Sequence, residues 1–309
     1  MHLMIPFAAP LSDGGREAAR ILALPKLGAL LALLLPHGRD EADEWSLSPP
    51  HERALAGAQG WVGADGALPW AARAAAADGI AVGHQAWGLL SPAHWHLGTD
   101  QVSLLDPAGL MLDDTASRVF FAAVADLFAG EGYALAYGAP SRWYAAHDSL
   151  ATLPTASLDR VIGRNVDRWL GKDPAARRIR RLQSEVQMRL YTHTLNDERS
   201  AQGLLPVNSF WLSGCGVVQA VAAHDMQVDC RLRAPALADD WAAWFKAWET
   251  LDAGPLVELL AAAKSGQPVR LTLCGERASA TFSSGPRSVM RSLKSRFAAP
   301  AWLPILESL

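Results

Sequence analysis

The sequence predicts an α/β protein with a largely parallel sheet flanked by helices. Short apolar segments of strand length alternate with longer helical segments, an order typical of parallel sheets. Half of the 309 residues are apolar and 19% are charged, which is enough to bury one large core or two modest ones. We expect residues 1–309 to form a single compact unit, with 1–60 plus 205–309 as a possible core and 61–204 as an inserted or extended region.

Apolar runs bounded by turn residues predict the strands. They fall at residues 2–7, 86–90, 133–137, 210–212 and 269–273. Helices are marked by proline or an acidic residue at the start and by glycine after the end. They fall at residues 69–78, 115–128, 157–169, 174–191, 238–250 and 256–264, and a further helix begins at Pro25. Residues 36–50 are rich in carboxylates and are predicted to form an exposed acidic loop.

Charge and cysteine content narrow the functional classes. The formal net charge is -3, which gives no global attraction to nucleic acid or to an acidic membrane surface. Three widely spaced cysteines form no C-x-x-C pair, which fits a reducing cytoplasm. The apolar run at residues 27–35 is too short to cross a bilayer, and the N-terminus lacks a basic export segment. We therefore expect a cytoplasmic protein without a membrane partner.

The helix predicted at residues 174–191 has an apolar face and a basic face. Its apolar residues are Ile179, Leu182, Val186 and Leu190, and its basic residues are Arg177, Arg178, Arg180 and Arg181. We interpret the basic face as solvated. Nucleic-acid binding by this face and by the C-terminal basic residues is an alternative that the near-neutral charge disfavours. Those C-terminal residues are Arg287, Arg291, Lys294 and Arg296.

The densest group of binding-type residues lies at residues 191–216. Two asparagines offer donors and acceptors, and the arginine between them offers a planar fork suited to phosphate or carboxylate. A Gly-x-Gly motif follows and is predicted to be a turn whose free N–H groups face an anion. The predicted ligand-binding residues here are Asn196, Arg199, Asn208, Ser213, Gly214 and Gly216. We expect the partner to be a small anionic metabolite.

A second constellation could hold a metal ion. His94 and His96 point to one side if the segment is extended, and Asp100 follows closely. Two histidines and a carboxylate can bind zinc or iron. The alternative interpretation, which we favour, is that these side chains orient a loop by hydrogen bonding. Cys215 is interpreted as a small residue in a crowded turn rather than as a nucleophile.

The spacing of the first group resembles a segment of the archaeal-type cofactor-independent phosphoglycerate mutases of the alkaline phosphatase superfamily. The matching pattern is Asn196-x-x-Arg199-x-x-x-Gly203-x-x-x-x-Asn208 followed by Gly214-x-Gly216. Leu24-Pro25-Lys26-Leu27 resembles the T-P-N-L helix start of that superfamily, and residues 271–277 lie where its late strand delivers T-G-D-H. The resemblance implies an alkaline-phosphatase-like core.

The whole chain more closely resembles a bacterial family described as phosphoglycerate-mutase-like or as the RpfE-type regulatory protein. The shared landmarks are the segments at residues 156–164, 183–188 and 206–214. Within the superfamily, two metal ions activate a serine or threonine nucleophile. Where its acidic ligand follows the first strand, this chain has Phe7-Ala8, and Glu276-Arg277 replaces its late D-H pair.

These departures imply a degenerate member that binds a phosphorylated or carboxylated metabolite in a regulatory role, without a cofactor and with no assignable catalytic residue. A guanidinium can replace a metal's positive charge, which adds Arg277 to the predicted ligand-binding residues. The alternative is an active metal-dependent mutase or phosphatase with rearranged ligands for manganese or zinc. Its candidate ligands are His94, His96, Asp100 and Glu276.

Overall fold

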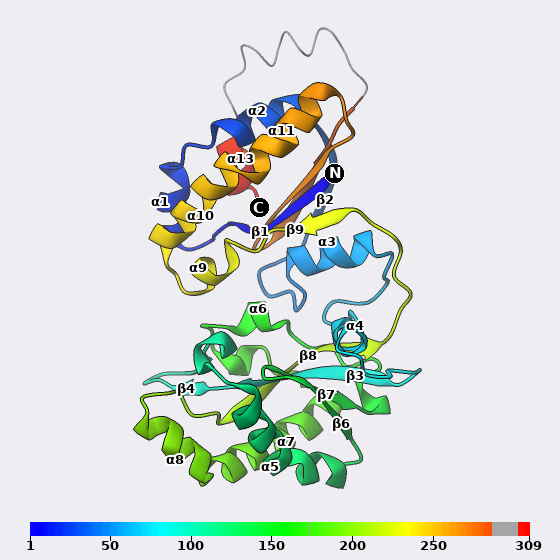
Figure 1. The fold of residues 1–309 in the computed structure, drawn as a ribbon, viewed down its shortest axis with the longest axis vertical. Helices are drawn as coiled ribbons and strands as arrows, with labels where there is room; N and C mark the ends of the chain where they lie inside the picture. Colours follow the sequence, from blue (N-terminus) through cyan, green and yellow to red (C-terminus); the bar gives the residue numbers. More distant parts are fainter. Residues whose placement is uncertain (173, 286–301) are drawn as a thin grey trace. The chain divides into compact units, whose positions relative to one another are not determined.

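The computed structural model describes residues 1–172, 174–285 and 302–309 (Figure 1). Its contacts divide the chain into two compact units, and each is described by itself. Unit 1 comprises Met1–Gly60 and Ala222–Leu309, and unit 2 comprises Trp61–Val221. Unit 2 is therefore an insertion between the two segments of unit 1. These contact-based units end at Gly60 and Val221, and the domain organisation expected from the sequence stays a prediction.

Unit 1 contains a five-stranded sheet of mixed direction in the order β2-β11-β10-β1-β9. Its strands are β1 (His2–Ala9), β2 (Leu35–Glu41), β9 (Met226–Val228), β10 (Arg270–Gly275) and β11 (Ala278–Ser283). β1 runs parallel to β9 and β10, whereas β11 runs antiparallel to β10 and β2. Strands from both ends of the chain thus pair directly in the middle of this sheet.

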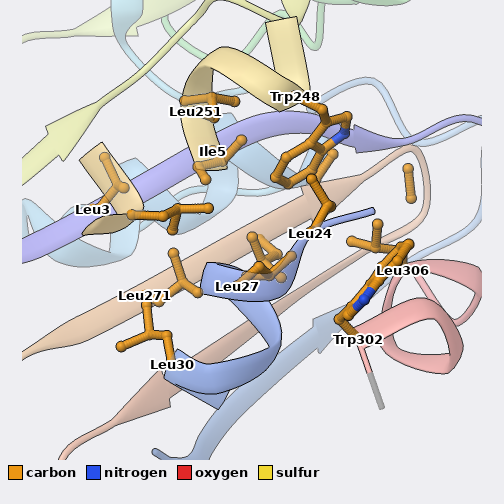
Figure 2. Packing of buried hydrophobic residues seen from close by; sticks show 14 of the residues in the cluster. Leu3, Ile5, Leu24, Leu27, Leu30, Trp248, Leu251, Leu271, Trp302 and Leu306 are labelled. Atoms are coloured by element: carbon orange, nitrogen blue, oxygen red, sulfur yellow. The ribbon is translucent and has the colours of Figure 1, made fainter. Parts of the chain in front are cut away.

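Helices of unit 1 bury a large apolar core against one face of this sheet. They are α1 (Asp13–Arg20), α2 (Pro25–Leu33), α9 (Arg233–Leu237), α10 (Trp241–Ala253), α11 (Pro255–Ser265) and α13 (Trp302–Glu307). Helix α3 (Pro50–Ala58) contributes no residue to this core. Figure 2 shows Leu27 and Leu30 of α2 beside Leu271 of β10, with Trp248 of α10 close by. Leu27, Trp248 and Leu271 are fully buried, which makes this packing the main apolar contribution to unit 1.

Alternate residues of the same strands face away from that core and form a polar row. Leu3 and Ile5 of β1 belong to the core, whereas His2 of the same strand does not. His2 Nε2 lies 2.9 Å from Thr272 Oγ1, which lies 2.9 Å from Thr281 Oγ1. The side chains thus alternate between the two faces with the period of two of a β-strand, and His2, Met4 and Thr272 on the second face are also buried.

Unit 2 is built on a four-stranded sheet in the order β6-β7-β3-β8, and every neighbouring pair is antiparallel. The strands are β3 (Ala86–Ala93), β6 (Ala134–Ala139), β7 (Arg142–Ala146) and β8 (Ser209–Val217), and a separate ribbon joins β4 (Trp95–Leu97) to β5 (Val102–Leu104). The α-helices are α4 (Trp70–Ala77), α5 (Asp114–Gly130), α6 (Leu158–Val161), α7 (Pro174–Tyr191) and α8 (Thr194–Ala201). Three short 3₁₀ helices are η1 (Pro107–Leu110), η2 (Asp148–Leu150) and η3 (Val166–Arg168).

The two faces of the unit 2 sheet are covered by different helices. Trp143 and Ala145 of β7 pack into a cluster with residues of α5 and α7, whereas Tyr144 packs into a cluster with α4. The sheet is therefore the middle of three layers, as the ribbon also shows (Figure 1). Because both faces are buried, the strands are apolar at nearly every position, which is also how parallel strands look in a sequence.

The mixed α/β class is confirmed, but the sheets are not largely parallel. The expectation failed because strand β7 was not recognised in the sequence. It follows β6 after a tight turn at residues 140–141, and the two strands pair antiparallel. The acidic segment 36–50 also begins as strand β2 rather than as a loop. The helix expected at residues 157–169 is broken into α6 and η3, because Gly163 takes a left-handed φ of 74°.

Two further expectations concern partners. Among the described residues, no helix combines the length and apolarity needed to cross a bilayer. The C-terminal basic residues proposed for nucleic acid all lie outside the described ranges. They are Arg287, Arg291, Lys294 and Arg296.

Burial gives His2 a pH dependence that can be measured. Burial, assisted by the charge of Arg270, lowers the pKa of His2 to about 4. The unfolded imidazole titrates near 6.5. Between these values the unfolded state binds more protons, so the free energy of unfolding falls as the pH falls through this window. Between pH 7 and pH 4.5, we expect the free energy of unfolding to fall by about 2 kcal/mol more in wild type than in His2→Gln.

Urea denaturation of both proteins at the two pH values measures this difference, since glutamine can keep a hydrogen bond to Thr272. Identical losses in wild type and His2→Gln would contradict the assignment.

Candidate functional site

Asn196 lies on helix α8 rather than in a strand or loop, and its side-chain amide binds main chain. Its Nδ2 donates to Leu190 O at 2.9 Å and to Val207 O at 2.8 Å. Its Oδ1 accepts from Val207 N at 2.9 Å. These bonds occupy both ends of a buried amide and tie the end of α7 to the segment that leads into β8.

Arg199, one turn further along α8, has the same kind of partners. Its Nε and one terminal nitrogen donate to Leu205 O at 3.0 and 2.9 Å, and that terminal nitrogen also donates to Leu110 O. Burial lowers the pKa of the guanidinium, while the charge of Asp113 opposes this shift. The planar fork that suits an anion is here directed at backbone carbonyls.

Asn208 binds the main chain of a neighbouring strand. Its Oδ1 accepts from Trp95 N at 2.7 Å, and its Nδ2 donates to Trp95 O at 3.0 Å. The side chain thus continues the pairing of β4 as a backbone strand would. A ligand role for Asn196, Arg199 and Asn208 remains a prediction, and it would require some of these bonds to open.

The Gly-x-Gly motif lies inside strand β8, not in the turn that the sequence predicts. Opposite Trp87 and Leu89 of β3, β8 carries an extra residue, so Gly214 occupies a bulge with a φ of +63°. A Cβ at Gly214 would lie 2.9 Å from Trp70 Cβ, and one at Gly216 would lie 3.1 Å from Pro69 Cβ. The glycines let the start of helix α4 approach the strand closely.

Two neighbours of these glycines are equally enclosed. Ser213 is buried and pairs with Leu89 of β3. Cys215 is fully buried, and burial raises the pKa of its thiol to about 12. Such a thiol is not a nucleophile at neutral pH, which agrees with its interpretation as a packing residue.

Glu276 and Arg277 lie in unit 1, directly after β10. Glu276 Oε1 accepts from Leu11 N at 3.2 Å, and the Arg277 side chain is exposed. The adjacent Gly275 packs against Leu309, since a Cβ there would lie 2.6 Å from the Leu309 carbonyl carbon. The predicted ligand-binding residues therefore belong to two units, with Arg277 in unit 1 and the others in unit 2.

The helix start at Pro25 has an internal carboxylate partner. Asp252, which is buried, accepts from Lys26 N at 3.1 Å and from Leu27 N at 2.8 Å. The N-terminal N–H groups of a helix favour negative charge, and Asp252 supplies it here. The N–H groups at the helix start that resembles T-P-N-L thus have an internal partner.

The metal-ligand candidates form a pair but not a complete site. The ring centroids of His94 and His96 lie 6.4 Å apart, and His94 Nδ1 lies 2.9 Å from Pro206 O. His96 and Asp100 are exposed, and Glu276 belongs to the other unit. Within the described ranges, no three His, Cys, Asp or Glu side chains come close enough together to hold a metal ion.

The structure also has a pocket in unit 2 between helix α7 and residues 153–156, which sequence reasoning missed. Its cavity volume is about 30 Å³, and it is open on one side. Helix α7 contributes side chains at positions 176, 179, 180 and 183, the spacing of one helical face. Trp169 and Trp211 also line the pocket. A concave, mostly apolar site with a few polar groups is typical of small-molecule binding.

Arg180 lines this pocket, unlike the other basic residues of α7. Arg178 and Arg181 are exposed and pair with Glu131, and Arg189 pairs with Asp126. Arg180 is half-buried, and its guanidinium has no ion pair or hydrogen bond with any described residue. The solvated basic face stays a prediction, and within it Arg180 is the arginine whose guanidinium is available to an anion in the pocket.

Gln183 is the second polar group of the pocket, and it is 3% exposed. Its Nε2 donates to Phe210 O of β8 at 3.2 Å, whereas its Oε1 is buried without a partner among the described residues. Because a carbonyl can only accept, this bond fixes which end of the amide faces β8. The available sequence signal was a glutamine on the apolar face of α7, between Leu182 and Val186.

Comparisons with known proteins give only distant likenesses. No family model matches the chain, including any for the RpfE-type family, and no curated protein matches it. A solved cofactor-independent phosphoglycerate mutase from Thermoplasma acidophilum DSM 1728 is 15% identical over 99% of this chain and 98% of that chain, with a TM-score of 0.37. The PH0037 protein from Pyrococcus horikoshii is 12% identical over 92% and 87%, with a TM-score of 0.44. The functional argument therefore rests on the residues of this chain.

Glycine substitutions test the packing of α4 on β8. Gly203 has a φ of +72°, and no atom lies within 4 Å of an added Cβ. We therefore expect Gly203→Ala to lower the free energy of unfolding only through its left-handed backbone conformation, by about 1 kcal/mol. Gly214→Ala adds a close approach to backbone, and we expect it to lower the free energy of unfolding by about 3 kcal/mol. Chemical denaturation measures both variants, and equal losses would contradict the close-approach role.

Proposed function

We propose that this chain is a degenerate phosphoglycerate-mutase-like protein that binds a small phosphorylated or carboxylated metabolite in a regulatory role. We place the ligand in the pocket between α7 and residues 153–156. The observation that carries the proposal is the half-buried Arg180 guanidinium, which lines the pocket with no carboxylate partner. An uncommitted guanidinium in a pocket can bind an anionic ligand through charge-assisted hydrogen bonds.

The walls of the pocket support a small organic ligand rather than a bare inorganic ion. Trp169 and Trp211 present flat apolar surface, and Leu153, Ile179 and Leu212 add aliphatic surface. An organic body would bury this surface while its charged group reaches Arg180. Both phosphate and carboxylate match the geometry of a guanidinium, so the pocket is compatible with either.

Three features of unit 1 support the loss of two-metal phosphoryl transfer. Phe7 and Ala8 occupy the end of β1 where the resemblance expects an acidic ligand. Asp252 occupies the helix start at Lys26 and Leu27. Leu309 packs onto Gly275 at the end of β10. The first-strand position that the resemblance assigns to a metal ligand is thus apolar, and Glu276-Arg277 replaces the late D-H pair.

The alternative is an active metal-dependent mutase or phosphatase, and it makes a different prediction. It requires His94, His96, Asp100 and Glu276 to assemble around manganese or zinc. We expect the purified protein to show neither mutase nor phosphatase turnover in manganese, with no change on His96→Ala. Metal analysis and both assays test this, and turnover with two bound metal ions per chain would overturn the degenerate interpretation.

Arg180 gives the direct test of ligand binding. We expect millimolar phenyl phosphate and benzoate, in the presence of a chelator, to raise the melting temperature of wild type, since a ligand that binds only the folded state stabilises it. Arg180→Gln should lose at least about tenfold in affinity, because a charge-assisted bond contributes more than about 1.4 kcal/mol.

The matched control is Arg177→Gln, which removes an exposed charge from the same helix outside the pocket. It should bind like wild type. Equal affinity in wild type, Arg180→Gln and Arg177→Gln would refute the proposed site.

A further inference from the structure

We infer that the anionic group of the ligand in the α7 pocket is a single carboxylate, which makes the ligand a small monocarboxylic acid rather than a phosphate ester. This inference deepens the proposed function and rests on it. The observation that carries it is the charge of the pocket lining. Among the described residues that line the pocket, Arg180 is the only one with an ionisable side chain. The pocket therefore offers one full positive charge to a ligand.

The other side-chain donors of the pocket are committed to main-chain carbonyls. Their bonds are Trp211 Nε1 to Ala156 O at 2.9 Å, Gln183 Nε2 to Phe210 O at 3.2 Å and Thr155 Oγ1 to Gly66 O at 3.4 Å. The indole nitrogen of Trp169 is buried, which keeps it from a ligand in the open pocket. The guanidinium of Arg180 is thus the side-chain donor that the described lining leaves for a ligand.

A carboxylate matches this guanidinium in charge and in number of oxygens. The planar fork donates two parallel hydrogen bonds to the two oxygens of a carboxylate, which share one negative charge. A phosphate monoester carries close to two negative charges above its second pKa, near 6, and it has three acceptor oxygens. In this pocket one of those oxygens would lack a side-chain donor, and the second negative charge would lose hydration without compensation.

Helix α7 adds too little positive charge to change this balance. Ala176, the third residue of α7, lines the pocket, so the positive end of the helix dipole lies nearby. That end is equivalent to about half an elementary charge. Together with Arg180 the pocket offers roughly one and a half positive charges, which exceeds what a carboxylate needs and falls short of a phosphate dianion.

The test is calorimetric titration of the full chain with benzoate and phenyl phosphate at pH 7.5, in the presence of a chelator. We expect benzoate to bind wild type at least about tenfold more tightly than phenyl phosphate, because the dianion leaves one charge uncompensated. Phenyl phosphate that binds at pH 7.5 as tightly as benzoate, or more tightly, would overturn the inference.

The same titrations at pH 5 separate the charge of the probe from its shape. Phenyl phosphate is mostly a monoanion at pH 5, so its affinity should rise about tenfold relative to pH 7.5. Benzoate is the internal control, since a carboxyl group titrates near pH 4 and its affinity should stay constant. An affinity for phenyl phosphate that does not rise as the pH falls would contradict the role of charge.

The protein side of the contact does not titrate between these pH values. Among the described residues, the lining contains no histidine, aspartate or glutamate. The charged neighbours of Arg180 on α7 are Arg177 and Arg181, and a guanidinium is always protonated in proteins. A change in the affinity of phenyl phosphate alone therefore reports the charge of the probe.

Variants of two exposed cations test whether a second positive charge serves the ligand. Lys172 follows the lining residue Gly171, and Arg177 precedes Arg180 by one turn, but neither lines the pocket. We expect Lys172→Gln and Arg177→Gln to bind both probes like wild type. A selective loss of phenyl phosphate binding in either variant would show a second cation at the site and would overturn the single-charge assignment.

Failure of the inference and failure of the proposed function give different results. If both probes bind, both lose affinity in Arg180→Gln and phenyl phosphate binds at pH 7.5 at least as tightly as benzoate, the pocket stands and the carboxylate assignment is wrong. If neither probe binds wild type, or if Arg180→Gln binds both unchanged, the inference and the proposed function are both wrong.

Discussion

The hydrogen bond from Gln183 Nε2 to Phe210 O fixes the chemistry of the unit 2 pocket. It crosses from helix α7 to strand β8 inside an apolar cluster, so the amide can neither leave nor turn over without losing its carbonyl partner. Because the nitrogen is held by the sheet, the oxygen faces away from Phe210 O. Arg180 lies on the same face of the helix, and both residues line the open pocket.

The residues that looked most like a binding site in the sequence stabilise the scaffold around this pocket. Asn196 and Arg199 bind the carbonyls of residues 190, 205 and 207, and Asn208 binds Trp95. These bonds fix the segment that enters β8, the strand that also carries Phe210 and Trp211. Polar side chains that satisfy buried main chain are as sharply patterned as ligand-binding ones, so composition alone does not separate the two.

The sequence predicted most elements because their local signals agree with their burial. Helix 174–191 and the strands at residues 2–7 and 269–273 have the expected periods and are present in the structure. Parallel direction was mispredicted, since the unit 2 strands are buried on both faces and lack the alternation that marks antiparallel sheets. The turn at Gly214 was mispredicted. A sequence does not distinguish a glycine that allows a helix to pack closely from a glycine that allows a turn.

The pocket could not be predicted, because it depends on which side of α7 each arginine faces. Four arginines within five residues look alike in a sequence, and only packing against residues 153–156 and Trp211 separates Arg180 from Arg177, Arg178 and Arg181. Gln183 was the one local anomaly, a polar side chain in an apolar stripe. Buried polar residues without an internal partner are rare, which makes such a position informative once a helix is established.

The chain's 12 tryptophans allow the central claim, that this pocket binds a small organic acid, to be tested directly. Indole N–H resonances of ¹⁵N-tryptophan-labelled protein can be followed during titration with benzoate. The account predicts saturable shifts at Trp169 and Trp211, which line the pocket, and no comparable shift at Trp244 or Trp248 in the core of unit 1. Saturable shifts confined to other tryptophans, or none at any tryptophan, would contradict it.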